Sequence, residues 1–212
     1  MRSRILARTL VSAVTVVGIA VGSLATGGSS FAASDSTAGS GELNTVADQA
    51  APSAESVYAA EAGAAGLSAR QAAQLQDRVD ARLANLKVPA QQVSYNEIRT
   101  TDGSASITLS SPGAAADSSC KYTYLCLWAG ANWSGEKLAF FKCEFRDLGD
   151  YNFDNRLTSY KNNQSSGTRA KFYNWEGGSS PWIYKFDSHA YHTEDSLANT
   201  PWDNMIDGVQ VC

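Results

Sequence analysis

The stretch CKYTYLCLWAGANWSG, residues 120–135, decides the fold of this chain. Two cysteines frame its start, and it contains the apolar run Tyr124–Trp128, which predicts a short buried strand. Trp128 and Trp133 are five residues apart, and Gly135 follows two residues later.

Similar short runs continue to the C-terminus. Of the 21 aromatic residues, 18 lie in residues 120–212. Apolar or alternating runs are separated by clusters of Gly, Ser, Asn and Asp, a pattern typical of an antiparallel sandwich or barrel. We therefore predict an all-β C-terminal domain over residues 120–212. Its expected strands are Tyr124–Trp128, Leu138–Phe141, Leu157–Lys161, Ala170–Trp175, Trp182–Phe186 and Val209–Val211.

The N-terminus predicts export. Arg2, Arg4 and Arg8 precede the short apolar run Leu10–Ala20, and small residues follow as far as Ala32. This order predicts a signal peptide over residues 1–32 and a secreted protein; a membrane anchor is the alternative, but Ser and Gly interrupt the apolar run. Cleavage removes three Arg and no acid, so the formal charge of −4 becomes −7. A mildly acidic chain without basic clusters argues against nucleic acid, or a membrane surface after cleavage, as a partner.

Two further segments lie between the signal peptide and the β domain. Residues 33–65 are rich in Ala, Ser and Gly, which predicts a disordered linker. Residues 66–112 predict a helix that begins after the cap Ser68 and ends before Pro89, followed by a β-hairpin. The hairpin strands are expected in 93–98 and 105–109, with Thr101-Asp102-Gly103 at the turn.

The role of residues 66–112 has two interpretations. The helix and hairpin either pack on the β domain or form a pro-region or tether that this domain can do without. We favour the second interpretation, because all the cysteines and nearly all the aromatics lie beyond Ser119. Residues 113–119 are then a linker.

The cysteines number four, all in the last part of the chain: Cys120, Cys126, Cys143 and Cys212. An even number in an exported chain predicts two disulfides. Zinc is the competing interpretation, but there is no Cys pair separated by two residues and no His at ligand spacing from a Cys.

The cysteine frame, the Trp-Ser-Gly hairpin and the run NNQSSGT at 162–168 together resemble the Streptomyces-type secreted metalloproteinase inhibitor family. The spacing of Trp128, Trp133 and Gly135 is likewise similar to the Greek-key signature of βγ-crystallins. That similarity implies a folded hairpin in which the aromatic rings pack together and the glycine adopts a positive φ. The resemblance implies a βγ-crystallin-like double Greek-key sandwich stapled by two disulfides. Of the three connectivities that four cysteines allow, we predict Cys120–Cys126 and Cys143–Cys212.

The resemblance also suggests a calcium run. Asp154, Asn155, Arg156, Thr158 and Ser159 lie in the sequence DNRLTS, which matches the calcium-binding pattern of the βγ-crystallin fold. The second run, DNMIDG at 203–208, ends in Asp-Gly where Ser/Thr-Ser is expected. We therefore predict weak calcium binding at most and no required cofactor.

We predict a secreted peptidase inhibitor that presents a rigid, disulfide-held loop to an extracellular protease, a metalloprotease by resemblance. The alternative is a calcium- or carbohydrate-binding module that acts at a cell surface or as a toxin-like factor. An exposed row of aromatics would favour the alternative, although we expect Trp128, Trp133, Tyr173 and Trp182 to fill the core. A monomer is assumed.

An enzyme is not expected. The chain has two His and no G-x-S-x-G, and we interpret His189 and His192 as loop residues rather than zinc ligands. A carboxylate pair for glycoside hydrolysis stays open, because Glu136, Glu144 and Glu176 are available.

Overall fold

A computed structural model describes residues 53–179 and 181–212, so the predicted signal peptide and most of the predicted linker lie outside the described residues. The helices are α1 (Ala54–Ala64) and α2 (Ala69–Ala84), with 3-10 turns η1 (Ala131–Trp133) and η2 (Leu148–Tyr151). The strands are β1 (Ala90–Ser94), β2 (Glu97–Thr100), β3 (Ala105–Thr108), β4 (Tyr124–Trp128), β5 (Lys137–Phe140), β6 (Phe145–Asp147), β7 (Ser159–Asn163), β8 (Arg169–Trp175), β9 (Trp182–His189), β10 (His192–Glu194) and β11 (Gly208–Gln210).

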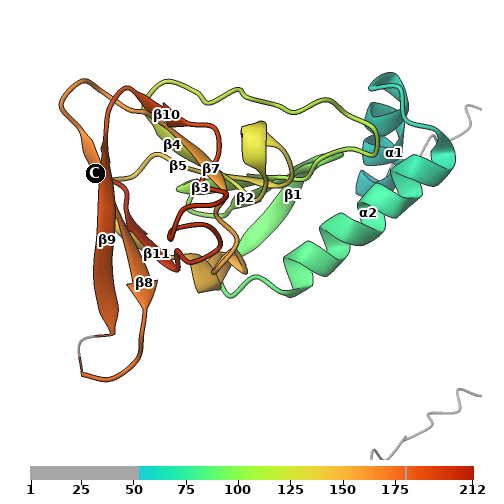
Figure 1. The fold of residues 1–212 in the computed structure, drawn as a ribbon. Helices are drawn as coiled ribbons and strands as arrows, with labels where there is room; N and C mark the ends of the chain where they lie inside the picture. The colour runs from blue at the N-terminus through green and yellow to red at the C-terminus, as the bar shows by residue number, and fades with distance from the viewer. Residues whose placement is uncertain (1–52, 180) are drawn as a thin grey trace, which may run out of the picture. The chain divides into compact units, whose positions relative to one another are not determined.

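The described strands form two antiparallel sheets. One has seven strands in the order β1-β2-β3-β5-β4-β7-β10, and the other has four in the order β6-β11-β8-β9 (Figure 1). All six strands predicted in residues 120–212 are present, and the structure adds the short β6 and β10. The all-β prediction is therefore confirmed, whereas the double Greek-key connectivity stays a prediction.

Helix α2 begins where the sequence predicts. The Ser68 side chain accepts from the Gln71 backbone, and the Gln71 side chain accepts from the Ser68 backbone, which completes a capping box. The helix buries Leu75 and Val79. It stops at the cap residue Asn85, slightly earlier than Pro89 alone would require.

The upstream segments correct two expectations. Residues 54–64 form helix α1 instead of a disordered linker, because Ala62 is buried and Tyr58 donates a hydrogen bond of 2.9 Å to the Gln92 carbonyl. The first predicted hairpin strand is in fact two strands, because the chain turns at 95–96 between β1 and β2. The predicted turn at Gly103 is confirmed, with φ at +68°.

The upstream segments also share a core with the β domain, contrary to the separation that we favoured. Strand β3 pairs with β5, with Ile107 opposite Leu138. Leu75 and Val79 of α2 belong to one buried cluster with large side chains of the β domain, which include Phe140, Phe153 and Phe172. A sheet cannot end at β5 without exposing an edge and an apolar face, and β3 and α2 cover both.

A buried ion-pair network reinforces this junction. Arg82 on α2 donates to Glu136 at 2.5 Å, and Arg156 donates to the other oxygen of Glu136 at 3.3 Å. Both arginines also donate to the carbonyl of Asn152. Desolvation lowers the pKa of Arg82, and Glu136 opposes that shift. The helix is thereby tied to the turn before β5 and to the loop that follows η2.

Two disulfides complete the domain with the predicted pairing, Cys120–Cys126 and Cys143–Cys212. The second bridge closes a separation of 69 residues and joins the segment before β6 to the C-terminus after β11. In the described residues no helix is long and apolar enough to cross a membrane.

Candidate functional site

The segment that precedes β4 lies on the surface and has no regular secondary structure over residues 114–121. We call residues 113–123 the bridged segment, because Cys120 within it is bonded to Cys126. Residues 113–119 and 121–123 are exposed. The sequence predicts a linker over residues 113–119 and assigns residues 120–123 to the β domain.

The backbone of the bridged segment is nevertheless held at successive residues. The carbonyl of Asp117 accepts from the Trp128 indole at 3.0 Å, and that of Ser118 accepts from Lys161 at 2.7 Å. The carbonyl of Ser119 accepts from Lys137 at 3.2 Å, and that of Cys120 accepts from Asn163 at 2.8 Å. Side chains of β4, β5 and β7 therefore fix an exposed backbone that no strand pairs with.

Asp117 adds a charged anchor. Its carboxylate lies 2.5 Å from the ammonium of Lys137 and accepts from the Ser119 backbone at 2.9 Å. Partial desolvation acts to raise its pKa, but Lys137 and Ser119 outweigh that effect and lower the pKa to about 2. Because this pKa is depressed in the fold, the anchor's contribution is present above the unfolded pKa of ~3.9 and is lost as the pH falls towards 2.

The Cys120–Cys126 ring ends in a tight turn. Tyr124 donates its N–H to the Lys121 carbonyl at 3.1 Å, and Thr123 donates to the Asn163 carbonyl at 2.8 Å. Thr123 has a φ of +76°, which a β-branched residue adopts only when its surroundings impose it. Tyr122 projects from this turn with 56 % of its surface exposed and stacks on Tyr191 at 6.5 Å.

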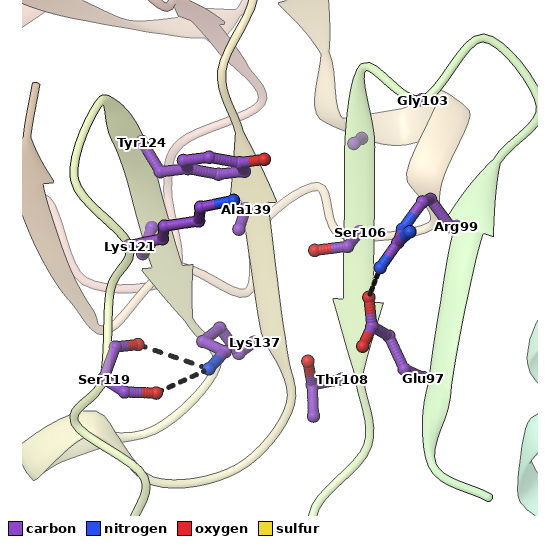
Figure 2. A pocket seen from close by; sticks show the side chains of 12 residues that line it. Glu97, Arg99, Gly103, Ser106, Thr108, Ser119, Lys121, Tyr124, Lys137 and Ala139 are labelled. Carbon is purple, nitrogen blue, oxygen red and sulfur yellow. Dashed lines mark hydrogen bonds and ion pairs between the residues drawn. The ribbon is translucent and has the colours of Figure 1, made fainter. Parts of the chain in front are cut away.

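A groove runs beside the bridged segment on the outer face of the larger sheet. It has a volume of about 410 Å³. Figure 2 shows Ser119, Lys121 and Tyr124 along one side and Glu97 and Arg99 along the other. Small side chains such as Ser106 and Ala139 lie between them. The groove leaves one flank of the segment accessible.

The polar run at 162–164, which begins in the last two residues of β7, has a structural role. Asn162 and Gln164 are buried; Asn162 donates to the Ser188 carbonyl at 2.7 Å, and Gln164 donates to the Val211 carbonyl at 2.6 Å. Asn163, between them, donates to the Cys120 carbonyl. These three consecutive side-chain amides therefore connect the end of β7 to β9, to the C-terminus and to the bridged segment. From sequence, this run contributes only to the family resemblance, because the carbonyl to which a side-chain amide donates cannot be predicted when it is distant in the chain.

The side chains of the predicted calcium run have different surroundings. Asp154 and Asn155 are exposed, Arg156 pairs with Glu136, and Thr158 and Ser159 are buried. The Ser159 hydroxyl donates to the Gly130 carbonyl at 2.7 Å and accepts from the Trp133 backbone, so it closes the predicted folded hairpin. Gly135 has the expected positive φ of +77°.

The two runs do lie against each other. Asn155 donates its N–H to the Ile206 carbonyl, and Asn204 donates to the Leu157 carbonyl, both at 3.1 Å. Among the described residues no group of three or more His, Cys, Asp or Glu could hold a metal ion. Weak calcium binding stays a prediction; titration calorimetry tests it, and two tight sites would contradict it.

The other residues considered from sequence are dispersed. His189 ends β9 and His192 begins β10, and both are exposed. Glu136, Glu144 and Glu176 pair with different cations, which are Arg82 and Arg156, Arg146, and Lys185 respectively. Trp128 is buried as expected, but Trp133, Tyr173 and Trp182 are only partly buried.

Comparison with known proteins gives a single kind of relationship. No curated protein and no solved structure matches the chain. The model of peptidase inhibitor family I36 matches residues 113–183, a span that begins at the bridged segment. The resemblance that the cysteine frame predicts is thus confirmed: residues 113–183 are similar to peptidase inhibitor family I36.

Proposed function

We propose that the protein is a secreted inhibitor of extracellular proteases, that metalloproteases are its targets, and that the bridged segment is the part that the protease binds. The match to peptidase inhibitor family I36 carries the inhibitor function. The choice of metalloproteases rests on the resemblance seen in the cysteine frame. The choice of segment rests on two features: all its residues except Cys120 are exposed, and four of its carbonyls are held by hydrogen bonds.

Such an arrangement is suited to inhibition because the segment is ordered before it meets a protease. Fixing one residue's backbone costs about 1–2 kcal/mol, and a flexible peptide meets this cost when it binds. In the bridged segment the disulfide and the side chains of Lys137, Lys161 and Asn163 have already imposed the order. The segment can therefore bind as a substrate does, and a cut chain would still be held in place.

Tyr122 is the side chain that we place in the protease's specificity pocket. It is more than half exposed, it lies at the tip of the disulfide ring, and its stacking on Tyr191 limits its motion. Rigid aromatic side chains of this kind supply much of the binding free energy at protein interfaces.

The test is an inhibition titration of the purified chain against a thermolysin-like metalloprotease and a subtilisin-like serine protease. We expect inhibition of the metalloprotease, weakened about 30-fold or more by Tyr122→Ala, which corresponds to the ~2 kcal/mol of an interface hot spot. The matched control is Tyr184→Ala, which removes a similarly exposed tyrosine on β9 and should inhibit like the wild type.

Two results would count against the proposal. If neither protease is inhibited, the inhibitor function fails. If inhibition occurs but Tyr122→Ala inhibits as well as the wild type, the protease binds elsewhere on the molecule.

A further inference from the structure

The smaller sheet carries a row of aromatic rings on the side turned away from the core. We call Phe145, Tyr173, Trp175, Trp182 and Tyr184 the aromatic face; they come from β6, β8 and β9. The opposite side of the same strands supplies core residues such as Phe172. The register shifts between Phe172 and Tyr173, because Lys185 of β9 has no partner in β8; beyond this bulge Tyr173 pairs with Tyr184 and Trp175 pairs with Trp182.

The rings brace one another. Trp175 and Trp182 have centroids 4.8 Å apart and planes at 70°, and Phe145 meets Trp182 at 4.9 Å and 69°. Tyr173 contacts Phe145 at 5.6 Å and Tyr184 at 6.0 Å, again edge to face. This geometry is the favourable one for aromatic pairs, so the rings have fixed orientations before any ligand arrives.

The backbone beneath the rings is adapted to them. A Cβ atom at Gly208 of β11 would come within 2.7 Å of both Phe145 and Trp182. The glycine therefore allows these two rings to lie directly on the strand. Their placement depends on the sheet itself and not on a flexible loop.

The exposed part of the aromatic face is small. Trp175 and Tyr184 are each 51 % exposed, and Phe145 is 40 % exposed. About half of the 150–250 Å² that an aromatic side chain can bury gives roughly 300 Å² for the three rings. A stable protein interface needs ~800 Å² on each partner. The area is too small for a protein partner or a second copy, but it matches a few sugar rings, whose C–H faces are apolar.

Ion pairs lie at both ends of the row. Lys185 and Glu176 are 2.6 Å apart beside Trp175, and Arg169 and Asp187 are 2.9 Å apart on the far side of Tyr184. Partial desolvation and the nearby Asp187 carboxylate raise the pKa of Tyr184. These charged groups supply strong donors and acceptors for hydroxyl groups at the edges of a sugar chain.

We propose that the aromatic face binds a polysaccharide, a flat β-1,4-linked chain of pyranose rings that stacks on Phe145, Trp175 and Tyr184 while its hydroxyls meet the two ion pairs. A flat chain fits because the rings lie on a sheet surface and not in a cavity. This site is separate from the bridged segment and does not rest on the inhibitor function.

The experiment is co-sedimentation of the full chain with insoluble chitin, cellulose and peptidoglycan. The wild type should bind at least one of them. Chitin and peptidoglycan without cellulose would indicate recognition of N-acetyl groups, and binding to all three would indicate recognition of the shared ring geometry. Trp175→Ala and Tyr184→Ala should each weaken binding about tenfold, as expected for the loss of one aromatic contact.

The matched control is Tyr191→Ala, which removes a similarly exposed ring next to Tyr122 and should leave polysaccharide binding unchanged. Protease inhibition by the Trp175 and Tyr184 variants should equal that of the wild type, and their melting temperatures should fall only by the few degrees that the loss of one aromatic pair costs. The proposal is overturned if the wild type binds none of the three polysaccharides or if the variants bind normally. It is also overturned if Trp175→Ala instead reduces inhibition or dissociates a dimer, since the face would then bind protein.

Discussion

At the scale of single residues, Glu136 is the centre of a buried ion-pair network with Arg82 and Arg156. Its carboxylate is 10 % exposed and receives two arginines, one of which, Arg82, is almost fully buried. Glu136→Gln should cost about 3–5 kcal/mol of unfolding free energy, because it leaves the Arg82 charge without a counterion. Glu144→Gln removes an exposed partner of Arg146 and should cost ~1 kcal/mol or less. Chemical denaturation of both variants checks this, and equal losses would contradict the structure.

The carboxyl group of Asp207 is expected to make the stability of the fold depend on pH. Desolvation and the nearby carboxylates of Asp154 and Asp147 raise its pKa. The hydrogen bond that the backbone N–H of Trp175 donates to its carboxylate lowers the pKa by a smaller amount. A carboxyl with a raised folded-state pKa contributes stability at low pH that is lost as the pH rises through that pKa. Asp207→Asn should therefore raise the melting temperature at pH 7, by ~2–4 °C for each kcal/mol gained, and not at pH 3. The exposed control Asp195→Asn should change neither, and a variant that melts lower at pH 7 would show that the ionised form is favoured.

At the scale of elements, α2 and β3 decide whether the β domain stands alone. Leu75, Val79 and Ile107 are buried against it, and each contributes roughly 1.5–3 kcal/mol. A chain that begins at Gly113 would lose these side chains and leave β5 as an exposed edge. We expect its melting temperature to fall by more than about 10 °C, with new binding of a hydrophobic dye. A truncated chain as stable as the full one would restore the interpretation of residues 66–112 as a dispensable pro-region.

Elements also show what could be predicted from sequence. The capping box of Ser68 and Gln71 and the turn at Gly103 are local, so their residues determine them directly. The pairing of β3 with β5 joins segments some thirty residues apart. The alternation around Ile107 predicts which face of β3 is buried, but it does not predict which strand pairs with β3. The bulge at Lys185 of β9 is also not evident from sequence; it places Trp182, predicted to lie in the core, on the outer face, where Tyr173 lies because it alternates with the buried Phe172. The long-range hydrogen bonds to the bridged segment could not be predicted from sequence either, for the same reason.

At the scale of the whole molecule, the two disulfides have different roles. In the loop-entropy model, the bridge that closes 69 residues contributes roughly 4 kcal/mol and the bridge that closes 6 contributes roughly 2. Replacing Cys143 and Cys212 by Ser should therefore lower stability more, whereas replacing Cys120 and Cys126 should weaken inhibition more. Thermal unfolding and inhibition titration of both double variants check this. Loss of inhibition only in the Cys143/Cys212 variant would place the inhibitory loop beside that bridge.

The most direct measurement of where a protease engages this molecule is the position of its first slow cut. The purified chain is incubated for a long period with a metalloprotease that it inhibits, and unreduced and reduced fragments are identified by mass spectrometry. Binding through the bridged segment predicts a single early cut between Gly113 and Tyr124; a cut inside the Cys120–Cys126 ring would separate the fragments only after reduction. A first cut elsewhere, for example in the β8–β9 turn at Gly177–Gly178, would contradict this account.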